Sequence, residues 1–227
     1  MSNLPNRRAL IERCYSSSVI VISKEPHCRL AKAKLVWLIT ERMMMSAAHE
    51  IRTERLLLRR WRPADREPFA ALNADPRVMK HFPGTLSRQE SDALVERAEA
   101  AFQQNGFGPW AAEIPNVVPL IGFVGLSVPG FKAHFTPCVE IGWRLAADYW
   151  NRGYATEAAG SALKAGFETF QLEEIVAFTV PANLPSRRVM EKIGMTHHDA
   201  DDFDHPLLPD GHLLKRHVLY RISRPVR

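Results

Sequence analysis

The sequence predicts an α+β domain built on a mixed β-sheet with helices on both faces. One strand-like run and two amphipathic helices come first, and three strand-like runs follow in close succession. A long helix then separates two further strand-like runs, which can pair in parallel because the helix carries the chain back across the sheet. This order of elements predicts a mixed sheet covered by helices on both sides.

Alternation, breaks and caps define the elements of the first half. Arg55–Trp61 alternates as a strand does, and a helix that starts at Pro63 stops at the Asp75-Pro76 break. Ser87 forms a capping box with Glu90 and predicts a second helix to Gln104. Three strands are then expected, at Pro109–Ile114, Leu120–Val128 and Val139–Leu145.

The second half adds two helices and three strands. A long helix is expected over Arg152–Phe170, followed by the strand Glu174–Val180. A short helix over Arg187–Ile193 is closed by Gly194. The last elements expected are a pair of strands near Thr196–Phe203 and Leu213–Ile222.

Residues 1–45 differ from the rest of the chain. They hold 8 Lys and Arg against 3 Asp and Glu, and two short apolar runs without a sustained period. Three methionines follow at positions 43–45. We therefore expect residues 1–45 to be a non-native or disordered extension upstream of the true start, and residues 46–227 to form the domain. A targeting peptide is the alternative, although Glu12, Glu25 and Glu41 make the segment richer in acid than a transit peptide.

The basic character of the chain comes from this extension. The net charge is +5, whereas residues 46–227 hold 22 basic and 22 acidic side chains. A neutral domain argues against direct nucleic-acid binding. No apolar run reaches the roughly 18–20 residues that cross a bilayer, so no membrane partner is expected. Three cysteines without a disulfide or zinc spacing favour a reducing cytoplasm.

The most informative stretch is the turn Trp150–Ala159, WNRGYATEAA, which follows the strand Val139–Leu145 and opens the long helix. The first N–H groups of a helix have no intrahelical partners and bind anions well. Gly153 leaves room for a close approach, and Arg152 adds a charge that phosphate oxygens accept. The turn therefore predicts a pyrophosphate site.

A second segment, after the strand Glu174–Val180, completes a family resemblance. Asn183-x-x-Ser186 is followed by Lys192-x-Gly194-Met195, and Trp150-x-x-Gly153-x-Ala155 lies about thirty residues earlier. The pair resembles the GNAT family of acyl-CoA N-acyltransferases, whose first motif reads Gln/Arg-x-x-Gly-x-Gly/Ala. The resemblance spans roughly Ile51 to Arg224. The strand TERLLLR, Thr53–Arg59, makes it look closest to the branch of ribosomal-protein N-terminal-alanine acetyltransferases.

The resemblance implies a mostly antiparallel sheet whose two central parallel strands splay apart around acetyl-CoA. Main-chain N–H groups of Leu145 and Trp143 are then expected to bind the pantetheine arm and the thioester oxygen. Trp150 replaces the usual Gln or Arg, which removes a polar contact and leaves the backbone cradle intact. The pyrophosphate is expected to bind the consecutive residues Arg152, Gly153, Tyr154, Ala155 and Thr156.

Two polar residues of the second motif are further candidates. Asn183 is expected to bond the pantetheine or its flanking loop, with helix capping as its other role. Many family members carry a Tyr, as the acid that protonates the thiolate, at the position of Met190, which cannot donate a proton. Ser186 is the nearest hydroxyl and the candidate acid, and an ordinary first-turn serine is the alternative.

Two residues are candidates for the base. Glu140 lies on the strand before the pyrophosphate turn and could take the proton directly or through one water. Its alternative role is a charge partner for Arg144 or for a residue of a neighbouring strand. His205, in the stiff run DHPLLPDGH, is the second candidate because an imidazole titrates near neutral pH. The run His197–His205 looks like a metal cluster, but its spacing matches no tetrahedral or EF-hand pattern, so no metal is expected.

These residues predict an acetyl-CoA-dependent N-acetyltransferase that works by direct transfer in a ternary complex. No credible nucleophile is present for a covalent intermediate. The acceptor is a primary amine, either a protein N-terminus or a small molecule. A catalytically degenerate acyl-CoA-binding sensor is the alternative that Met190 and Trp150 favour, and a homodimer stays open.

Overall fold

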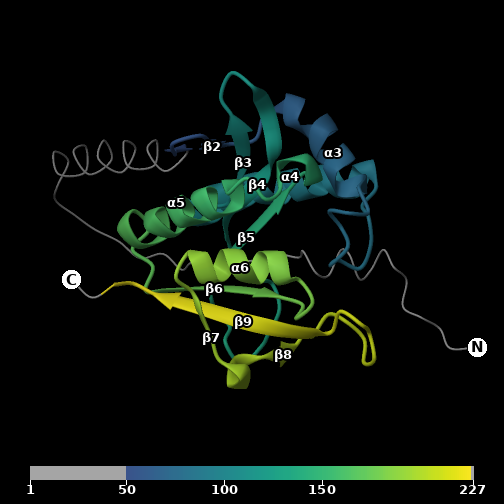
Figure 1. Cartoon of the computed structure of the whole chain (residues 1–227), viewed down its shortest axis with the longest axis vertical. Helices are drawn as coiled ribbons and strands as arrows, with labels where there is room; N and C mark the ends of the chain where they lie inside the picture. Colours follow the sequence, from purple (N-terminus) through teal and green to yellow (C-terminus); the bar gives the residue numbers. More distant parts are fainter. Residues whose placement is uncertain (1–49, 226–227) are drawn as a thin grey trace, which may run out of the picture.

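The computed structural model describes residues 50–225. The predicted extension at residues 1–45 lies outside the described residues. Nine strands of the described part pair into one twisted sheet, and four α-helices pack against it. Figure 1 shows β1 to β5 in its upper half and β6, β9, β7 and β8 in its lower half. The predicted α+β class is confirmed.

All neighbouring strands are antiparallel except β5 and β6, which are parallel. The order across the sheet is β1-β2-β3-β4-β5-β6-β9-β7, and β8 pairs with β9. The parallel pair therefore lies near the middle of the sheet. The strands are β1 (Ile51–Arg52), β2 (Leu57–Arg59), β3 (Pro109–Ile114), β4 (Val118–Ser127), β5 (Glu140–Leu145), β6 (Glu174–Thr179), β7 (Thr196–His197), β8 (Phe203–Asp204) and β9 (Arg216–Ser223).

The helices begin and end at local signals. The Oγ of Ser87 accepts the N–H of Glu90, and the Glu90 carboxylate accepts the N–H of Ser87, so the predicted capping box is confirmed. Gly106, with φ +77°, ends that helix in the left-handed region. The α-helices are α3 (Arg66–Ala74), α4 (Arg88–Asn105), α5 (Tyr154–Glu168) and α6 (Leu184–Lys192), and short 3₁₀ turns form η1 (Pro63–Asp65), η2 (Ala147–Tyr149) and η3 (Asp199–Asp201).

Several element boundaries differ from the sequence prediction. The helix α5 begins at Tyr154 rather than Arg152, because Gly153 before it is left-handed. The helix α6 begins at Leu184 rather than Arg187, since Asn183 caps it. The predicted strand Thr196–Phe203 is wrong, because η3 interrupts it and leaves β7 and β8 to pair separately with β9. Asp residues favour such turns, and three lie in or beside η3.

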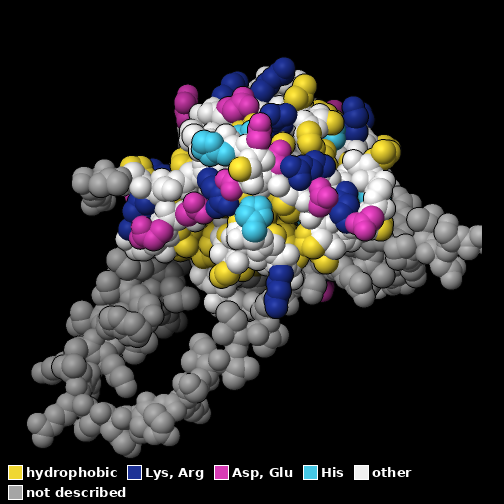
Figure 2. All heavy atoms as spheres, turned by 90° about the horizontal axis from the view of Figure 1, so that it is seen from below, with side chains coloured by type: hydrophobic (Ala, Val, Ile, Leu, Met, Phe, Trp, Pro, Cys, Tyr) yellow, Lys and Arg dark blue, Asp and Glu magenta, His cyan; other side chains and the backbone are white. Residues whose placement is uncertain are grey.

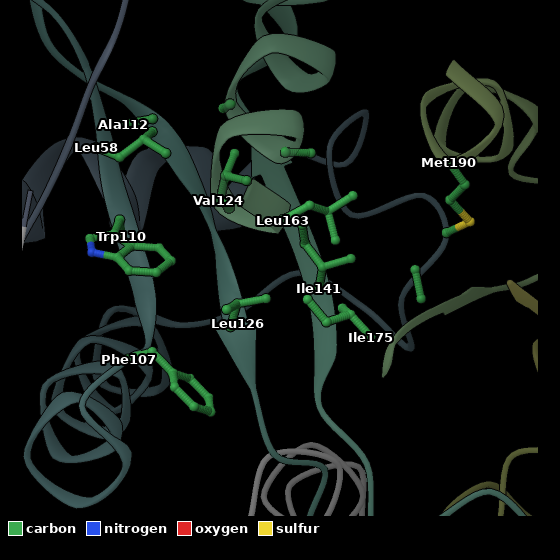
Figure 3. Close-up of a cluster of buried hydrophobic side chains, with 14 of the residues drawn as sticks. Leu58, Phe107, Trp110, Ala112, Val124, Leu126, Ile141, Leu163, Ile175 and Met190 are labelled. Carbon is green, nitrogen blue, oxygen red and sulfur yellow. The ribbon is translucent and has the colours of Figure 1, made fainter. Parts of the chain in front are cut away.

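The main core lies between the sheet and the pair α5 and α6. Alternate residues of the central strands face these helices, and α5 packs beside α6. Figure 3 shows Ile141 of β5 and Ile175 of β6 near Leu163 of α5, with Met190 pointing inward from α6. The opposite face carries two smaller clusters, one under α3 and one that contains Phe135, Val176, Phe203 and Leu219.

The described surface mixes both charge signs. In the view from below, Lys and Arg side chains alternate with Asp and Glu side chains, and histidines and apolar side chains lie between them (Figure 2). This distribution matches the equal numbers of basic and acidic residues in the domain. Among the described residues, no helix has the length and apolar character needed to cross a membrane.

Gly122 tests the close packing of β4 against β5. Its φ is +139°, and a Cβ there would lie 2.0 Å from the carbonyl oxygen of Arg144 on β5. We expect Gly122→Ala to lower the free energy of unfolding by about 2 kcal/mol or more, measured by urea denaturation. Gly160→Ala in α5 is the control, because its Cβ would meet nothing within 4 Å. That change should be neutral or stabilise by roughly 0.5–1 kcal/mol, and equal losses from both changes would contradict the prediction.

Candidate active site

The parallel strands β5 and β6 pair at one register position only, Glu140 with Val176. The N–H of Val176 donates to the carbonyl oxygen of Val139 at 2.9 Å. By contrast, β5 pairs with β4 along its whole length. The last part of β5 therefore has no strand partner on its β6 side within the described residues, and the sheet opens there.

Backbone groups of β5 point into this opening. The carbonyl of Val139 points towards β6, and backbone direction alternates along a strand, so Trp143 and Leu145 also direct their N–H and C=O groups to that side. Both side chains belong to the face covered by α5. The geometry is the one expected for binding an extended, amide-containing chain along the edge of β5.

Trp150 has a polar contact that the sequence prediction missed. Its indole Nε1 donates to the carbonyl oxygen of Leu145 at 2.8 Å, while 43% of the residue remains exposed. Trp150 thus satisfies the last carbonyl of β5 and leaves the N–H of Leu145 for another acceptor. The substitution of the family's usual Gln or Arg keeps a hydrogen-bond donor at this position.

The turn that is expected to bind the pyrophosphate lies directly before α5. Asn151 and Gly153 are both left-handed, with φ values of +58° and +82°. The first bond inside α5 runs from the N–H of Glu157 to the carbonyl of Gly153, at 3.0 Å. The N–H groups of Tyr154, Ala155 and Thr156 therefore precede the helical ladder and are directed outward along the helix axis. The positive end of the helix dipole adds to this attraction for an anion.

Arg152 is exposed at the start of this turn. Its guanidinium carbon lies 5.8 Å from the centre of the Tyr149 ring. The side chain makes no ion pair within residues 50–225. A phosphate at the helix N-terminus would lie within reach of a cation of this kind.

Arg55 and Glu157, which the sequence prediction did not single out, form an ion pair that contacts this turn. Arg55, between β1 and β2, donates from Nη1 to the carbonyl of Arg152 at 2.9 Å and from Nε to Glu157 at 2.6 Å. Its guanidinium also lies 4.6 Å from the centre of the Tyr154 ring. Both residues belong to segments that carried the family resemblance, TERLLLR and WNRGYATEAA, but their pairing is not visible in the sequence.

The second motif lies at the start of α6. The Oδ1 of Asn183 accepts the N–H of Ser186 at 3.4 Å, and its Nδ2 donates to Thr179 at 2.9 Å. The capping role of Asn183 is therefore confirmed, and its contact with a ligand stays a prediction. The hydroxyl of Ser186 makes no hydrogen bond within the described residues, so it is available to a ligand. Met190 is buried in the main core.

Glu140 reaches the opening from the opposite face. Its register partner Val176 belongs to the cluster with Phe135 and Phe203, away from α6. The carboxyl group is enclosed by protein, although the residue as a whole keeps some solvent contact, and this desolvation raises the pKa of Glu140 to about 8. A Cβ added to Gly142 would touch only Glu140 Oε1, at 3.8 Å, so there is room on the sheet beside the carboxyl.

Arg144 is directed towards Asn73 and Phe82. It is buried on the same face of β5 as Glu140 and donates to Asn73 Oδ1 at 2.6 Å, with its guanidinium carbon 4.2 Å from the centre of the Phe82 ring. Burial is the cause of the raised pKa of Glu140, and its carboxyl remains a candidate for proton transfer.

His205 is not the near-neutral imidazole that the sequence suggested. It is buried, with its ring centre 4.7 Å from that of Phe131 and 5.1 Å from that of His217. Burial, with a smaller effect from His217, lowers the pKa of His205 to about 4. The imidazole is therefore neutral at physiological pH and a weaker base than predicted.

Two other reactive groups have structural explanations. Burial and the nearby carboxyl of Glu140 raise the pKa of the Cys138 thiol to about 12, so little nucleophilic thiolate exists at neutral pH. His197, Asp199 and Asp202 bring ligand atoms within 4.8 Å of one another. However, His197 Nε2 and Asp202 Oδ1 are 2.7 Å apart, and Asp202 also accepts the N–H of Leu219, so this group joins β7 to β9.

Comparisons with known proteins identify the family of the chain. Residues 55–196 match the model of the acetyltransferase (GNAT) domain, and the chain belongs to this family. It is similar to an uncharacterized N-acetyltransferase, YnaD, of Bacillus subtilis, at 34% identity over 64% of this chain and 81% of the relative. The FsC-acetyl coenzyme A-N(2)-transacetylase of Aspergillus fumigatus is 30% identical over 80% of this chain and 79% of the relative.

Solved structures show the same fold. A GNAT-family acetyltransferase from Bacillus anthracis has a TM-score of 0.64 and 31% identity, covering 77% of this chain and 98% of its own. Mycobacterium smegmatis RimJ, solved with CoA-disulfide, has a TM-score of 0.58 and 21% identity, covering 74% and 81%, which shows the fold alone. The protein is thus an acetyltransferase of the GNAT family, which uses acetyl-CoA as its cosubstrate.

Gly153 tests the predicted pyrophosphate turn. We expect Gly153→Glu to weaken acetyl-CoA binding about tenfold or more in calorimetry, because a carboxylate would stand beside the diphosphate. Gly153→Asn is the matched control, since Asn tolerates the left-handed conformation and adds no charge. Equal affinity of Gly153→Glu and the native chain would contradict the assignment of this turn.

Proposed function

We propose that this chain transfers the acetyl group of acetyl-CoA to a primary amine by direct attack within a ternary complex. The observation that carries the proposal is the meeting of the turn Asn151–Gly153 with the opening between β5 and β6. The turn suits a diphosphate, and the opening suits a pantetheine arm. The CoA-disulfide named in the RimJ structure supports a coenzyme A ligand on this fold.

The reaction forms one bond and breaks one. The amine nitrogen attacks the thioester carbonyl carbon, and the carbon–sulfur bond breaks as the amide forms. The N–H of Leu145 is placed to donate to the carbonyl oxygen as negative charge develops there. One amine proton goes to the base, and the coenzyme A thiolate takes a proton from the acid.

Glu140 is the base in this proposal. A Cβ at Gly142 would meet Glu140 Oε1 at an ordinary contact distance, and in this proposal the acceptor amine or one bridging water reaches the carboxyl from that side. A pKa of about 8 lies close to the α-amino value of about 7.7–8.0, so the proton transfer is nearly balanced. His205 has the lower pKa and makes the weaker candidate.

Ser186 is the acid that protonates the leaving thiolate. It lies in the first turn of α6, on the face of the sheet opposite Glu140. In this proposal the acid and the base therefore reach the opening from opposite sides of the sheet. Its hydroxyl has no competing partner among the described residues.

Two acceptor classes fit these features. The Aspergillus relative is named for acetylation at an N(2) position, which supports a small-molecule amine. The strand TERLLLR supports a protein N-terminus, while solved ribosomal-protein acetyltransferases of 16–18% identity share only the fold. We also propose the cytoplasm as its location, from the cysteine pattern of the sequence.

A titration with two readouts tests the function. Acetyl-CoA is titrated into the full chain by calorimetry, and free thiol is then followed with a panel of small amines, polyamines and N-terminal peptides. Binding followed by thiol release with one amine supports the proposal and identifies the acceptor class. Binding without release across the panel would favour the sensor function, although the contacts of Trp150 and Met190 do not themselves favour it.

Glu140→Gln should change two pH profiles. The native kcat/KM should rise with pH to an apparent pKa near 8, as Glu140 loses its proton, and the variant should lose this rise and most of its activity. The folded pKa lies above the ordinary value of 4.5, so the stability that this group contributes is complete below about 4.5 and is lost as the pH rises through 8.

Urea denaturation at pH 5 and pH 8 measures the second profile. The native chain should lose more stability over this interval than Glu140→Gln. Glu168→Gln, at the exposed end of α5, is the control and should behave as the native chain does. Identical pH profiles for the native chain and Glu140→Gln would exclude Glu140 as the base.

Ser186→Ala should lower kcat and leave acetyl-CoA affinity within about twofold, because the hydroxyl acts on the leaving thiolate. General acids typically contribute on the order of 10²–10⁴-fold, and a neighbouring water would recover part of this. The measurement is the thiol-release rate at saturating acetyl-CoA beside the calorimetric affinity. A fully active variant would show that another group or water supplies the proton.

A further inference from the structure

We propose that Arg55 is a positioning residue for the pyrophosphate turn. It cancels the negative charge of Glu157 and so preserves the affinity of the turn for an anion. This inference rests on the proposed function, because the anion is the diphosphate of acetyl-CoA. It concerns residues on the far side of the turn from the reacting atoms.

Glu157 creates an electrostatic conflict at this site. It lies in the first turn of α5, close to the N–H groups that bind the diphosphate. The helix dipole stabilises a carboxylate at this position. The same carboxylate, however, repels a second anion at the same helix end. Burial alone would raise the pKa of Glu157, yet hydrogen bonds from Thr53 and Arg55 outweigh burial and keep the pKa below its usual range. The charge is therefore present at neutral pH.

Arg55 is placed to cancel that charge. Its backbone N–H donates to Glu157 Oε1 at 2.8 Å, its Nε donates to Oε2 at 2.6 Å, and Thr53 Oγ1 donates to Oε1 at 2.6 Å. Both carboxylate oxygens are thereby directed towards the β1–β2 turn and away from the helix end. The carboxylate and the guanidinium together contribute little net charge to the diphosphate site.

The same guanidinium restrains the turn itself. Nη1 donates to the carbonyl of Arg152, whose oxygen is a second electronegative atom near the anion site. Nη2 lies 3.2 Å from the position a Cβ of Gly153 would take, and the guanidinium faces the ring of Tyr154. Arg55 therefore contacts Arg152 and Tyr154, on either side of Gly153, and restrains the turn between them.

A role in stability alone does not account for this arrangement. The Arg55 side chain is 43% exposed, and ion pairs of such exposure contribute little to folding. The contacts nevertheless converge on one turn from a segment about a hundred residues away in the sequence. Their main consequence is therefore the local charge and shape of the anion site.

Four chains measured side by side test this inference: the native chain, Arg55→Gln, Glu157→Gln and the double variant. Calorimetric titration with CoA and with acetyl-CoA gives the affinities, and thermal unfolding reports folding. We expect Arg55→Gln to weaken binding about tenfold, because a lone carboxylate then faces the diphosphate. Glu157→Gln should bind within about threefold of the native chain. The double variant should recover most of the affinity that Arg55→Gln loses.

Arg52→Gln is the matched control. Arg52 lies in β1, three residues from Arg55, and pairs only with Glu50 at 3.7 Å among the described residues. Native affinity is expected for this variant, which separates a specific effect from a general loss of positive charge.

Each remaining outcome decides the inference. Native affinity in Arg55→Gln would overturn it and leave the proposed function intact. A folded double variant that binds as weakly as Arg55→Gln would also overturn it, because removal of the carboxylate would then have changed nothing. No binding of CoA or acetyl-CoA by the native chain would overturn both this inference and the proposed function.

Discussion

The single register pair between β5 and β6 is the constraint on which the site depends. The other neighbouring strands of the described sheet are antiparallel. Beyond Glu140, β5 keeps only its β4 partner, so the N–H groups of Trp143 and Leu145 face an opening. Buried backbone donors without partners are costly, and a ligand with amide and carbonyl groups supplies what the missing strand would have supplied.

Chain connectivity places two helix N-termini at this opening. The chain leaves the end of β5 through η2 and enters α5 after Gly153, and it leaves the end of β6 and enters α6 after Asn183. Because β5 and β6 are parallel, both helices begin at the same edge of the sheet. One helix end is free for an anion, and the other presents Ser186.

Glu140 in β5 and Glu157 in α5 have pKa values shifted in opposite directions. Glu140 is desolvated, and burial raises the pKa of its carboxyl, so the neutral form is favoured. Glu157 is less buried and accepts three hydrogen bonds from Thr53 and Arg55, so the ionised form is favoured. Environment rather than residue type therefore separates a group suited to proton transfer from a group suited to structural charge balance.

Local signals determined much of this protein from the sequence by itself. The Ser87–Glu90 capping box and the end of α4 one residue after Gln104 depend on residues a few positions apart, and the structure has them close to the prediction. Only the tertiary structure decided the partners that come from distant segments. These include Arg55 with Glu157, Asn73 with Arg144, and the burial of His205, which changed its pKa. Caps and turns are determined by residues that are close in the sequence. Charge balance and desolvation depend instead on which distant segments the sheet brings together.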